Sequence, residues 1–296
     1  MYYGTSPVPH RSHNRRGGMA FMPYPYPELE QKLRLLADPL PPPRPGDWLA
    51  EHPEPGQTFA EYLAAAPVRR SDKLTTIHLC FVGDFSEAQR RVLDLTRQYL
   101  ALFFDCPVKV NRQVPLASIP SRARRTHPSW GDRQVLTGYV LHELLEPERP
   151  ADALAYVALT ATDLWPGRGW NFVFGEANLR QRTGVWSIYR NGDPGEGEAG
   201  FRLCLRRTLG TASHELGHVL TIHHCTAFRC LMNGSNHQEE RDARPLHLCP
   251  DCLRKLCWNL QVEPVAYLTK LKVFCQQNDI DAEANWYEKA TTALNS

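Results

Sequence analysis

The sequence lacks any long hydrophobic run and any strong excess of charge of one sign. No apolar stretch approaches the roughly 18 residues that a membrane-spanning helix requires. The formal net charge is +2, so neither nucleic acid nor a membrane is expected as a partner. The arginines near the N-terminus are not followed by an apolar segment, so we expect no secretory signal there.

The cysteines give no pattern typical of disulfides. The chain has 9 cysteines, an odd number, and four of them belong to the metal pattern described below. The others are scattered in apolar surroundings, at Cys80, Cys106, Cys204, Cys257 and Cys275. We therefore expect buried free thiols in a reducing environment, and a cytoplasmic protein.

The clearest chemical signal is the pattern HExxH, formed by His214, Glu215 and His218. On a helix, histidines four residues apart share one face and can hold one metal ion. Zinc lowers the pKa of a bound water towards neutrality, and Glu215 is the candidate general base that accepts its proton. His224 lies ten residues after His214. This spacing suits a helix that stops after His218 and a chain that turns back to offer a third imidazole.

Four cysteines follow at once, in the patterns C-x4-C and C-x2-C. They are Cys225, Cys230, Cys249 and Cys252. Four thiolates in two such pairs fit a tetrahedral structural zinc site. Since His224 and Cys225 are adjacent, the two metal patterns share one junction. The sequence therefore predicts two zinc ions per chain, one catalytic and one structural.

Residues 211–256 resemble the archaemetzincins (peptidase family M54), which belong to the metzincin clan of zinc peptidases. The family signature is HExxHxxGxxHC, then C-x-M, then CxxC; the matching residues are His214, Glu215, His218, His224, Cys225, Cys230, Met232, Cys249 and Cys252. The resemblance implies a zinc metallopeptidase that hydrolyses peptide bonds, aminopeptidase-like or oligopeptide-cleaving, with a peptide or protein substrate. It also implies a Met-turn, in which the Met232 thioether packs beneath the histidines without binding the metal.

One residue departs from the family pattern, because Thr221 stands where the family has glycine. The turn at that position favours a positive φ, which is cheap for glycine and costly for a β-branched residue. Either the turn is made differently here or strain is tolerated. If the turn slips by one residue, His223 competes as the third ligand, although His224 is favoured because it directly precedes Cys225.

Two other functions stay open, the first of them because of the departure at Thr221. The first is a catalytically impaired pseudoenzyme or zinc-stabilised binding module, in which the fold is intact and the site is disturbed. The second is a zinc-finger-like interaction module at residues 225–252. The near-neutral charge and the lack of a basic, aromatic-interleaved patch beside the cysteines argue against nucleic acid as its partner.

The chain divides into a proline-rich N-terminal extension, residues 1–72, and a catalytic domain, residues 73–296. We expect a disordered tail over residues 1–27 and short helices in the rest of the extension.

In the catalytic domain, apolar β-branched runs predict strands at residues 74–83, 107–114 and 153–160, and further β segments at residues 171–175 and 184–189. The element order predicts an α/β (α+β) fold: a mixed twisted sheet packed with helices, one carrying HExxH, and a helical C-terminus. The resemblance implies the metzincin-like zincin version of this fold, with residues 172–177 forming or bordering a sheet edge that pairs with substrate. We expect a monomer.

Overall fold

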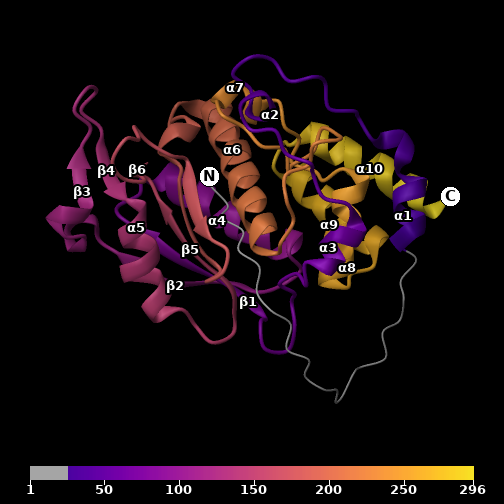
Figure 1. Cartoon of the computed structure of the whole chain (residues 1–296), viewed down its shortest axis with the longest axis horizontal. Coiled ribbons are helices and arrows are strands. Elements are labelled where there is room, and N and C mark those ends of the chain that lie inside the picture. The colour runs from indigo at the N-terminus through magenta and orange to yellow at the C-terminus, as the bar shows by residue number, and fades with distance from the viewer. Residues whose placement is uncertain (1–25) are drawn as a thin grey trace.

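The computed structural model describes residues 26–296. Residues 1–25 of the predicted disordered tail therefore lie outside the described part. Figure 1 shows the β-strands gathered on one side of the molecule and the C-terminal helices on the other, with helix α6 between them. In the described part, no helix combines the length and the apolar character needed to cross a bilayer.

The main sheet has five strands in the order β2-β1-β5-β8-β7. Their bounds are β1 Thr76–Val82, β2 Val108–Val114, β5 Ala153–Thr160, β7 Gly175–Asn178 and β8 Thr183–Ser187. All neighbours are parallel except β7, which runs antiparallel to β8 at the edge. A smaller sheet has the order β3-β4-β6, with β3 Arg124–Thr126, β4 Arg133–Leu136 and β6 Asp163–Trp165.

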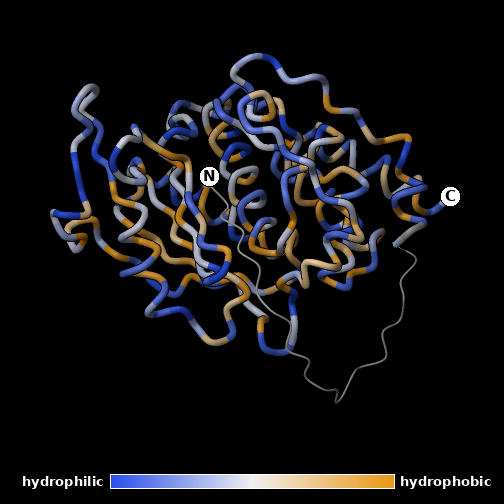
Figure 2. The backbone as a smooth tube through the Cα atoms, viewed as in Figure 1, coloured by the Kyte–Doolittle hydropathy of each residue, from blue (hydrophilic) through white to orange (hydrophobic). Residues whose placement is uncertain are grey.

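The side chains of the central strands alternate between two apolar layers. In β1, Ile77 and Leu79 belong to the larger core, whereas Cys80 and Val82 face the other layer. Every residue of β5 is buried, as expected for a parallel strand that is covered on both faces. Figure 2 shows apolar segments concentrated along the sheet and the inner faces of the helices.

The larger core is covered by two long helices, α4 Glu87–Phe103 and α6 Gly197–Val219. The chain ends in three more helices, α8 Pro250–Leu260, α9 Pro264–Gln277 and α10 Asp281–Asn295. Shorter helices are α1 Tyr26–Lys32, α2 Trp48–Glu51, α3 Phe59–Ala64, α5 Thr137–Tyr139 and α7 Gln238–Asp242. The predicted mixed α/β class with a helical C-terminus is confirmed. One strand was misplaced, because residues 171–174 precede β7 and lie outside it.

The segment before β1 packs on the rest of the chain. In Figure 1 it passes from α1 beside the C-terminal helices, over the molecule to α2, and down to α3. Leu33 and Tyr62 are fully buried in the larger core. Leu40 donates its backbone N–H to the Ala227 carbonyl at 3.0 Å. The boundary at residue 72 stays a prediction, but from residue 26 onwards the extension shares the main core.

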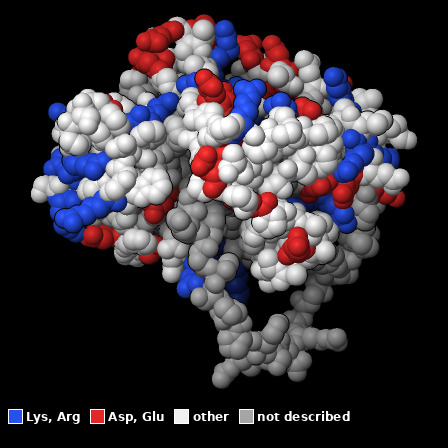
Figure 3. All heavy atoms as spheres, turned by 45° about the horizontal axis from the view of Figure 1, so that its top comes forward, with Lys and Arg blue, Asp and Glu red and all other residues white. Residues whose placement is uncertain are grey.

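Basic side chains cluster at one end of the face that Figure 3 shows. Lys and Arg side chains cluster at the end of the molecule that carries β3 and β4 (Figure 3). Arg124 and Arg133 are exposed there, and Arg122 is paired with Glu143. Elsewhere on this face the two signs are mixed.

The packing of α3 predicts a measurable role for one hydroxyl group. Tyr62 Oη donates to the Leu220 carbonyl at 3.0 Å and accepts from Asn259 Nδ2 at 2.7 Å. Tyr62→Phe should therefore lower the free energy of unfolding by about 1–3 kcal/mol, because buried polar groups lose their partner. Urea unfolding tests this. Tyr139→Phe, a control for loss of a tyrosine hydroxyl, should stay within about 0.5 kcal/mol of wild type; an equally small effect at Tyr62 would contradict the prediction.

Candidate metal centres

Helix α6 carries two of the candidate metal ligands on one buried face. His214 and His218 are one turn apart, and their Nε2 atoms lie 3.0 Å from each other. His224, from the loop after the helix, joins them so that the three ligand atoms lie within 4.8 Å of one another. Tetrahedral zinc with nitrogen ligands would separate these atoms by roughly 3.3 Å. The three imidazoles therefore fit a single zinc ion.

The Nδ1 atom of each ring has its own hydrogen-bond acceptor. His214 Nδ1 lies 2.9 Å from the Leu231 carbonyl, and His218 Nδ1 lies 2.7 Å from the Ile222 carbonyl. His224 Nδ1 instead meets the Glu54 carboxylate, at 2.8 and 3.0 Å. The acceptors at His218 and His224 assign the proton of each ring to Nδ1, so Nε2 is the atom left to bind a metal. His214 Nδ1 also lies 3.1 Å from the Arg244 guanidinium, a donor, and its Nε2 faces that of His218.

Burial favours the neutral, metal-binding form of the two helical histidines. It lowers the pKa of His214 well below its ordinary value and that of His218 to about 3. A buried imidazole loses the hydration that stabilises its cation, so both rings are neutral at physiological pH. This removes the competition between protons and metal at the two ligands.

Glu215 is a buried carboxylate beside these rings. Burial raises its pKa, while the charges of His224, Arg244 and Arg241 act in the opposite direction. Its Oε2 atom is buried and has no hydrogen-bond partner among the described residues. A buried acceptor without a partner is costly in a folded protein, so this atom marks a place where a proton donor belongs.

The turn after α6 is left-handed at Thr221, so the structure has the strained turn, one of the two possibilities that the sequence left open. Thr221 has a φ of +69°. Its N–H donates to the His218 carbonyl at 2.8 Å, and the Ile222 N–H donates to the Gly217 carbonyl at 3.1 Å. This is a Schellman motif with threonine in the left-handed position. Two contacts support it: the Val68 N–H donates to Thr221 Oγ1 at 3.2 Å, and Gln57 Nε2 donates to the Thr221 carbonyl at 3.1 Å.

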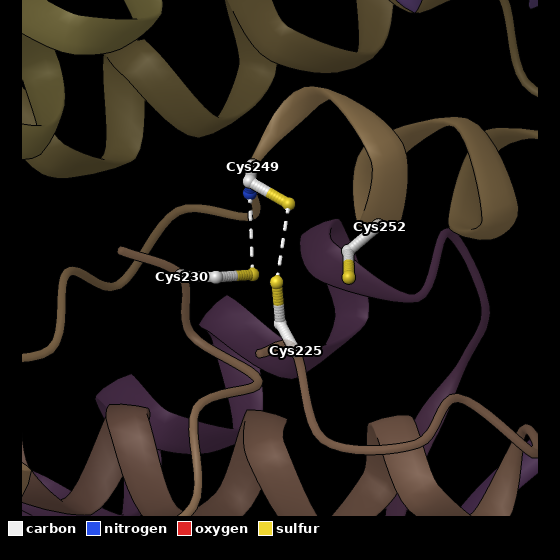
Figure 4. Close-up of side chains that lie close together, drawn as sticks. All are labelled: Cys225, Cys230, Cys249 and Cys252. Carbon is white, nitrogen blue, oxygen red and sulfur yellow. Dashed lines mark hydrogen bonds between the residues drawn. The ribbon is translucent and has the colours of Figure 1, made fainter. Parts of the chain in front are cut away.

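The four cysteines converge from the loop after α6 and the start of α8. Figure 4 shows their thiols pointing towards a common centre, with Cys249 and Cys252 at the first turn of α8. All four Sγ atoms lie within 4.8 Å of one another. Cys225 Sγ and Cys249 Sγ are 3.7 Å apart, close to the roughly 3.8 Å expected for thiolates on tetrahedral zinc.

The chemistry of these four thiols favours a bound cation. Burial raises the pKa of Cys230 well above its ordinary value, whereas hydrogen bonds from the other three thiols lower that of Cys225. Backbone N–H groups of Cys249 and Met232 also point at Cys230 Sγ, at 3.2 and 3.4 Å. Several buried thiolates so close together are stable only with a positive charge between them. The residues therefore fit a second zinc ion.

The two centres share the loop from His224 to Asn233. Asn233 ties it together, since its Nδ2 donates to the Cys225 carbonyl at 2.7 Å and its Oδ1 accepts from the Cys230 N–H at 2.8 Å. Leu231, within the same loop, supplies the carbonyl that meets His214. Displacing this loop would therefore move His224, which is one ligand of the histidine centre. It would also move the carbonyl acceptor of His214, a second ligand.

The structure separates the two neighbouring histidines. His224 lies with the other rings, whereas His223 is exposed and donates its backbone N–H to Gln57 Oε1 at 3.2 Å. Glu54, Gln57 and Asn233 were missed by sequence reasoning. The contact between Glu54 and His224 spans 170 residues, and no local spacing signals it.

The chain is similar to several known proteins. The model of Peptidase family M54 matches residues 154–257. Archaemetzincin-2 of Macaca fascicularis is 32% identical over 244 residues, covering 72% of this chain and 67% of that protein. Archaemetzincin of Thermococcus kodakarensis is 42% identical over 135 residues, covering 44% of this chain and 70% of its own. The crystal structure of archaemetzincin from Methanopyrus kandleri is similar over 63% of this chain and 97% of its own, with 26% identity and a TM-score of 0.47.

The left-handed turn predicts an unusual order of stability among variants of Thr221. Thr221→Val keeps the β-branched strain and removes the hydroxyl acceptor of the Val68 N–H. Thr221→Gly loses the same hydrogen bond but relieves the strain. The glycine variant should therefore be more stable than the valine variant by about 1–2 kcal/mol. Thermal and urea unfolding test this, and a valine variant as stable as the glycine variant would contradict it.

The shared loop predicts that damage to the cysteine centre reaches the histidine centre. Cys249→Ser should weaken zinc binding at the histidines by roughly 10–100-fold, because it loosens the loop that carries His224. Zinc competition against a chromophoric chelator measures this. Cys257→Ser, which changes a buried thiol of α8 outside the cluster, is the matched control and should retain both ions. If Cys249→Ser binds zinc at the histidines with unchanged affinity, the coupling between the two centres is contradicted.

Proposed function

This chain belongs to the archaemetzincin family, and on that premise we propose how it works as a zinc metallopeptidase. Its catalytic zinc is held by His214, His218 and His224, in the metzincin pattern HExxHxxxxxH. A second, structural zinc is held by four thiolates, those of Cys225, Cys230, Cys249 and Cys252. The observation that carries the proposal is Glu215 Oε2, which has no hydrogen-bond partner among the described residues and lies beside three buried imidazoles.

Glu215 is the general base of the proposed reaction. When bound, zinc supplies Lewis-acid chemistry, by polarising the scissile carbonyl and lowering the pKa of a water molecule. Glu215 accepts the proton of the attacking water at Oε2 and later delivers it to the leaving amine. Its burial favours the first step, because a carboxylate with a raised pKa accepts a proton more readily than an exposed one.

Met232 fits the proposed role of the Met-turn residue. It is fully buried, and a Cβ atom on Gly217 would lie only 2.7 Å from Met232 Sδ. The absence of a side chain at Gly217 therefore lets the thioether approach α6 between the two helical ligands. In this proposal Met232 supports the histidines from below and binds no metal.

The edge strand β7 is the proposed site for the substrate backbone. Within the described residues, β7 pairs only with β8, so its other side can receive an extended peptide. Phe174, the residue before β7, connects this edge to the helix of the metal ligands. The Arg241 guanidinium lies 4.0 Å from the centre of the Phe174 ring and also donates to Thr211 Oγ1 on α6. A peptide along β7 would thus run beside α6, and both aminopeptidase-like and oligopeptide cleavage are open to it.

The setting proposed for the enzyme is a cytoplasmic one. All nine cysteines are buried and free of disulfides, which suits a reducing compartment. We propose a monomer that acts on peptide or protein substrates, with no nucleic-acid or membrane partner. The turn at Thr221 no longer favours a pseudoenzyme or binding module, because the threonine adopts the left-handed geometry without displacing His224.

Glu215→Gln separates catalysis from metal binding. The variant should retain both zinc ions but lose about 10²–10⁴-fold in kcat, because its amide cannot accept the proton. A fluorogenic peptide library and elemental analysis measure the two properties. Glu239→Gln, on the exposed side of α7, should behave as wild type. Full activity in Glu215→Gln would exclude the general base, whereas an inactive wild type with both zinc ions would favour the pseudoenzyme.

A further inference from the structure

Glu54 lies in the segment between α2 and α3, with its carboxylate against the third histidine ring. Its Oε2 and Oε1 atoms are 2.8 and 3.0 Å from His224 Nδ1. The His224 side chain is 7% exposed and that of Glu54 is 26% exposed. This is therefore a contact at the edge of the buried centre, and differs from a fully solvated surface ion pair.

The carboxylate is itself held in place. Trp48 Nε1 donates to Glu54 Oε1 at 3.0 Å, and the Trp48 ring meets the His224 ring edge-on, with centroids 5.1 Å apart. The backbone N–H of Trp48 is in turn bound by the Glu240 carboxylate at 2.9 Å. Glu54 thus belongs to a connected network, and its approach to His224 has a defined direction.

The same segment also holds the backbone turn that leads to His224. The Gln57 side chain donates to the Thr221 carbonyl and accepts from the His223 N–H. The main chain of Gln57 is fixed by the buried Lys255, whose Nζ donates to its carbonyl. Residues 48–57 therefore contact the backbone before His224 and the ring of His224.

We propose that Glu54 is a positioning residue of the catalytic zinc site, holding the Nδ1–H of His224 so that Nε2 faces the metal. His214 and His218 stand on a helix and use backbone carbonyls as acceptors, whereas His224 stands on a loop. A carboxylate acceptor fixes the tautomer and orientation of such a ring and makes it a more basic ligand. The inference rests on the proposed function and assigns part of the N-terminal extension to the metal site.

Zinc binding by the chain of 296 residues tests the proposal. Elemental zinc is measured after dialysis against graded chelator, for wild type, Glu54→Ala and Glu54→Gln. His218→Ala identifies the ion held by the histidines, and the ion of the cysteine centre is the internal reference. Glu51→Ala, which alters an exposed carboxylate of α2, is the matched control.

We expect Glu54→Ala to bind the histidine-site ion about 10–100-fold more weakly, with the cysteine-site ion unchanged. Glu54→Gln should recover part of this loss, because its amide oxygen still accepts from Nδ1, and Glu51→Ala should match wild type. If Glu54→Ala does not fold, Trp48→Phe carries the test, since it removes the N–H that fixes Glu54 and keeps the ring; selective weakening of the same ion is expected.

Unchanged histidine-site affinity in the folded variants overturns the assignment. Equal loss of both ions also overturns it, because that result indicates a general role in folding. A wild-type chain with zinc only at the cysteines contradicts the proposed function itself, and is recognised before any Glu54 variant is compared.

Discussion

A three-histidine centre built on HExxH depends on how the chain reverses after its helix. A helix presents two imidazoles, one turn apart, to one metal ion. The third imidazole therefore has to come from the chain that follows the helix. Here the reversal is the Schellman turn at Thr221. A left-handed conformation costs a residue with a side chain about 1–2 kcal/mol. The N-terminal segment offsets this cost with hydrogen bonds to the hydroxyl and carbonyl groups of that threonine.

The second centre extends the same constraint beyond the turn. His224 is followed directly by Cys225, and the loop between the cysteine pairs returns to supply the Leu231 carbonyl to His214. Zinc at the cysteines would therefore fix both ends of this loop. Metal binding contributes to folding free energy where ligands come together only in the folded chain. A zinc ion at the cysteines would therefore stabilise the histidine centre without sharing a ligand with it.

The sequence predicted the parts of the fold and site that have local signals. The β1 and β5 strands follow from continuous apolar runs, and the two metal patterns follow from the spacing of histidines and cysteines. Glu54 and Gln57 could not be found in this way, because they lie in a proline-rich segment and reach their partners only after the chain has folded over them.

The edge strand was misplaced for a different reason. The apolar run before it predicts a strand from residue 171, but Phe174 packs beneath Arg241 and Val173 bridges Leu164. Regular pairing begins only at Gly175. A Cβ atom there would lie 2.0 Å from the Trp186 ring, so this close approach requires glycine. Tertiary contacts, which the pattern of hydrophobic residues does not encode, decide where β7 starts.

The proposed chemistry requires two metal centres assembled around one loop. Its most direct test is the number of zinc ions per chain, by elemental analysis of folded protein purified without added metal. We expect about two, one at each centre. About one would leave only the thiolate centre filled, and would contradict the proposed catalytic site. None, from a folded chain, would contradict both proposed metal centres.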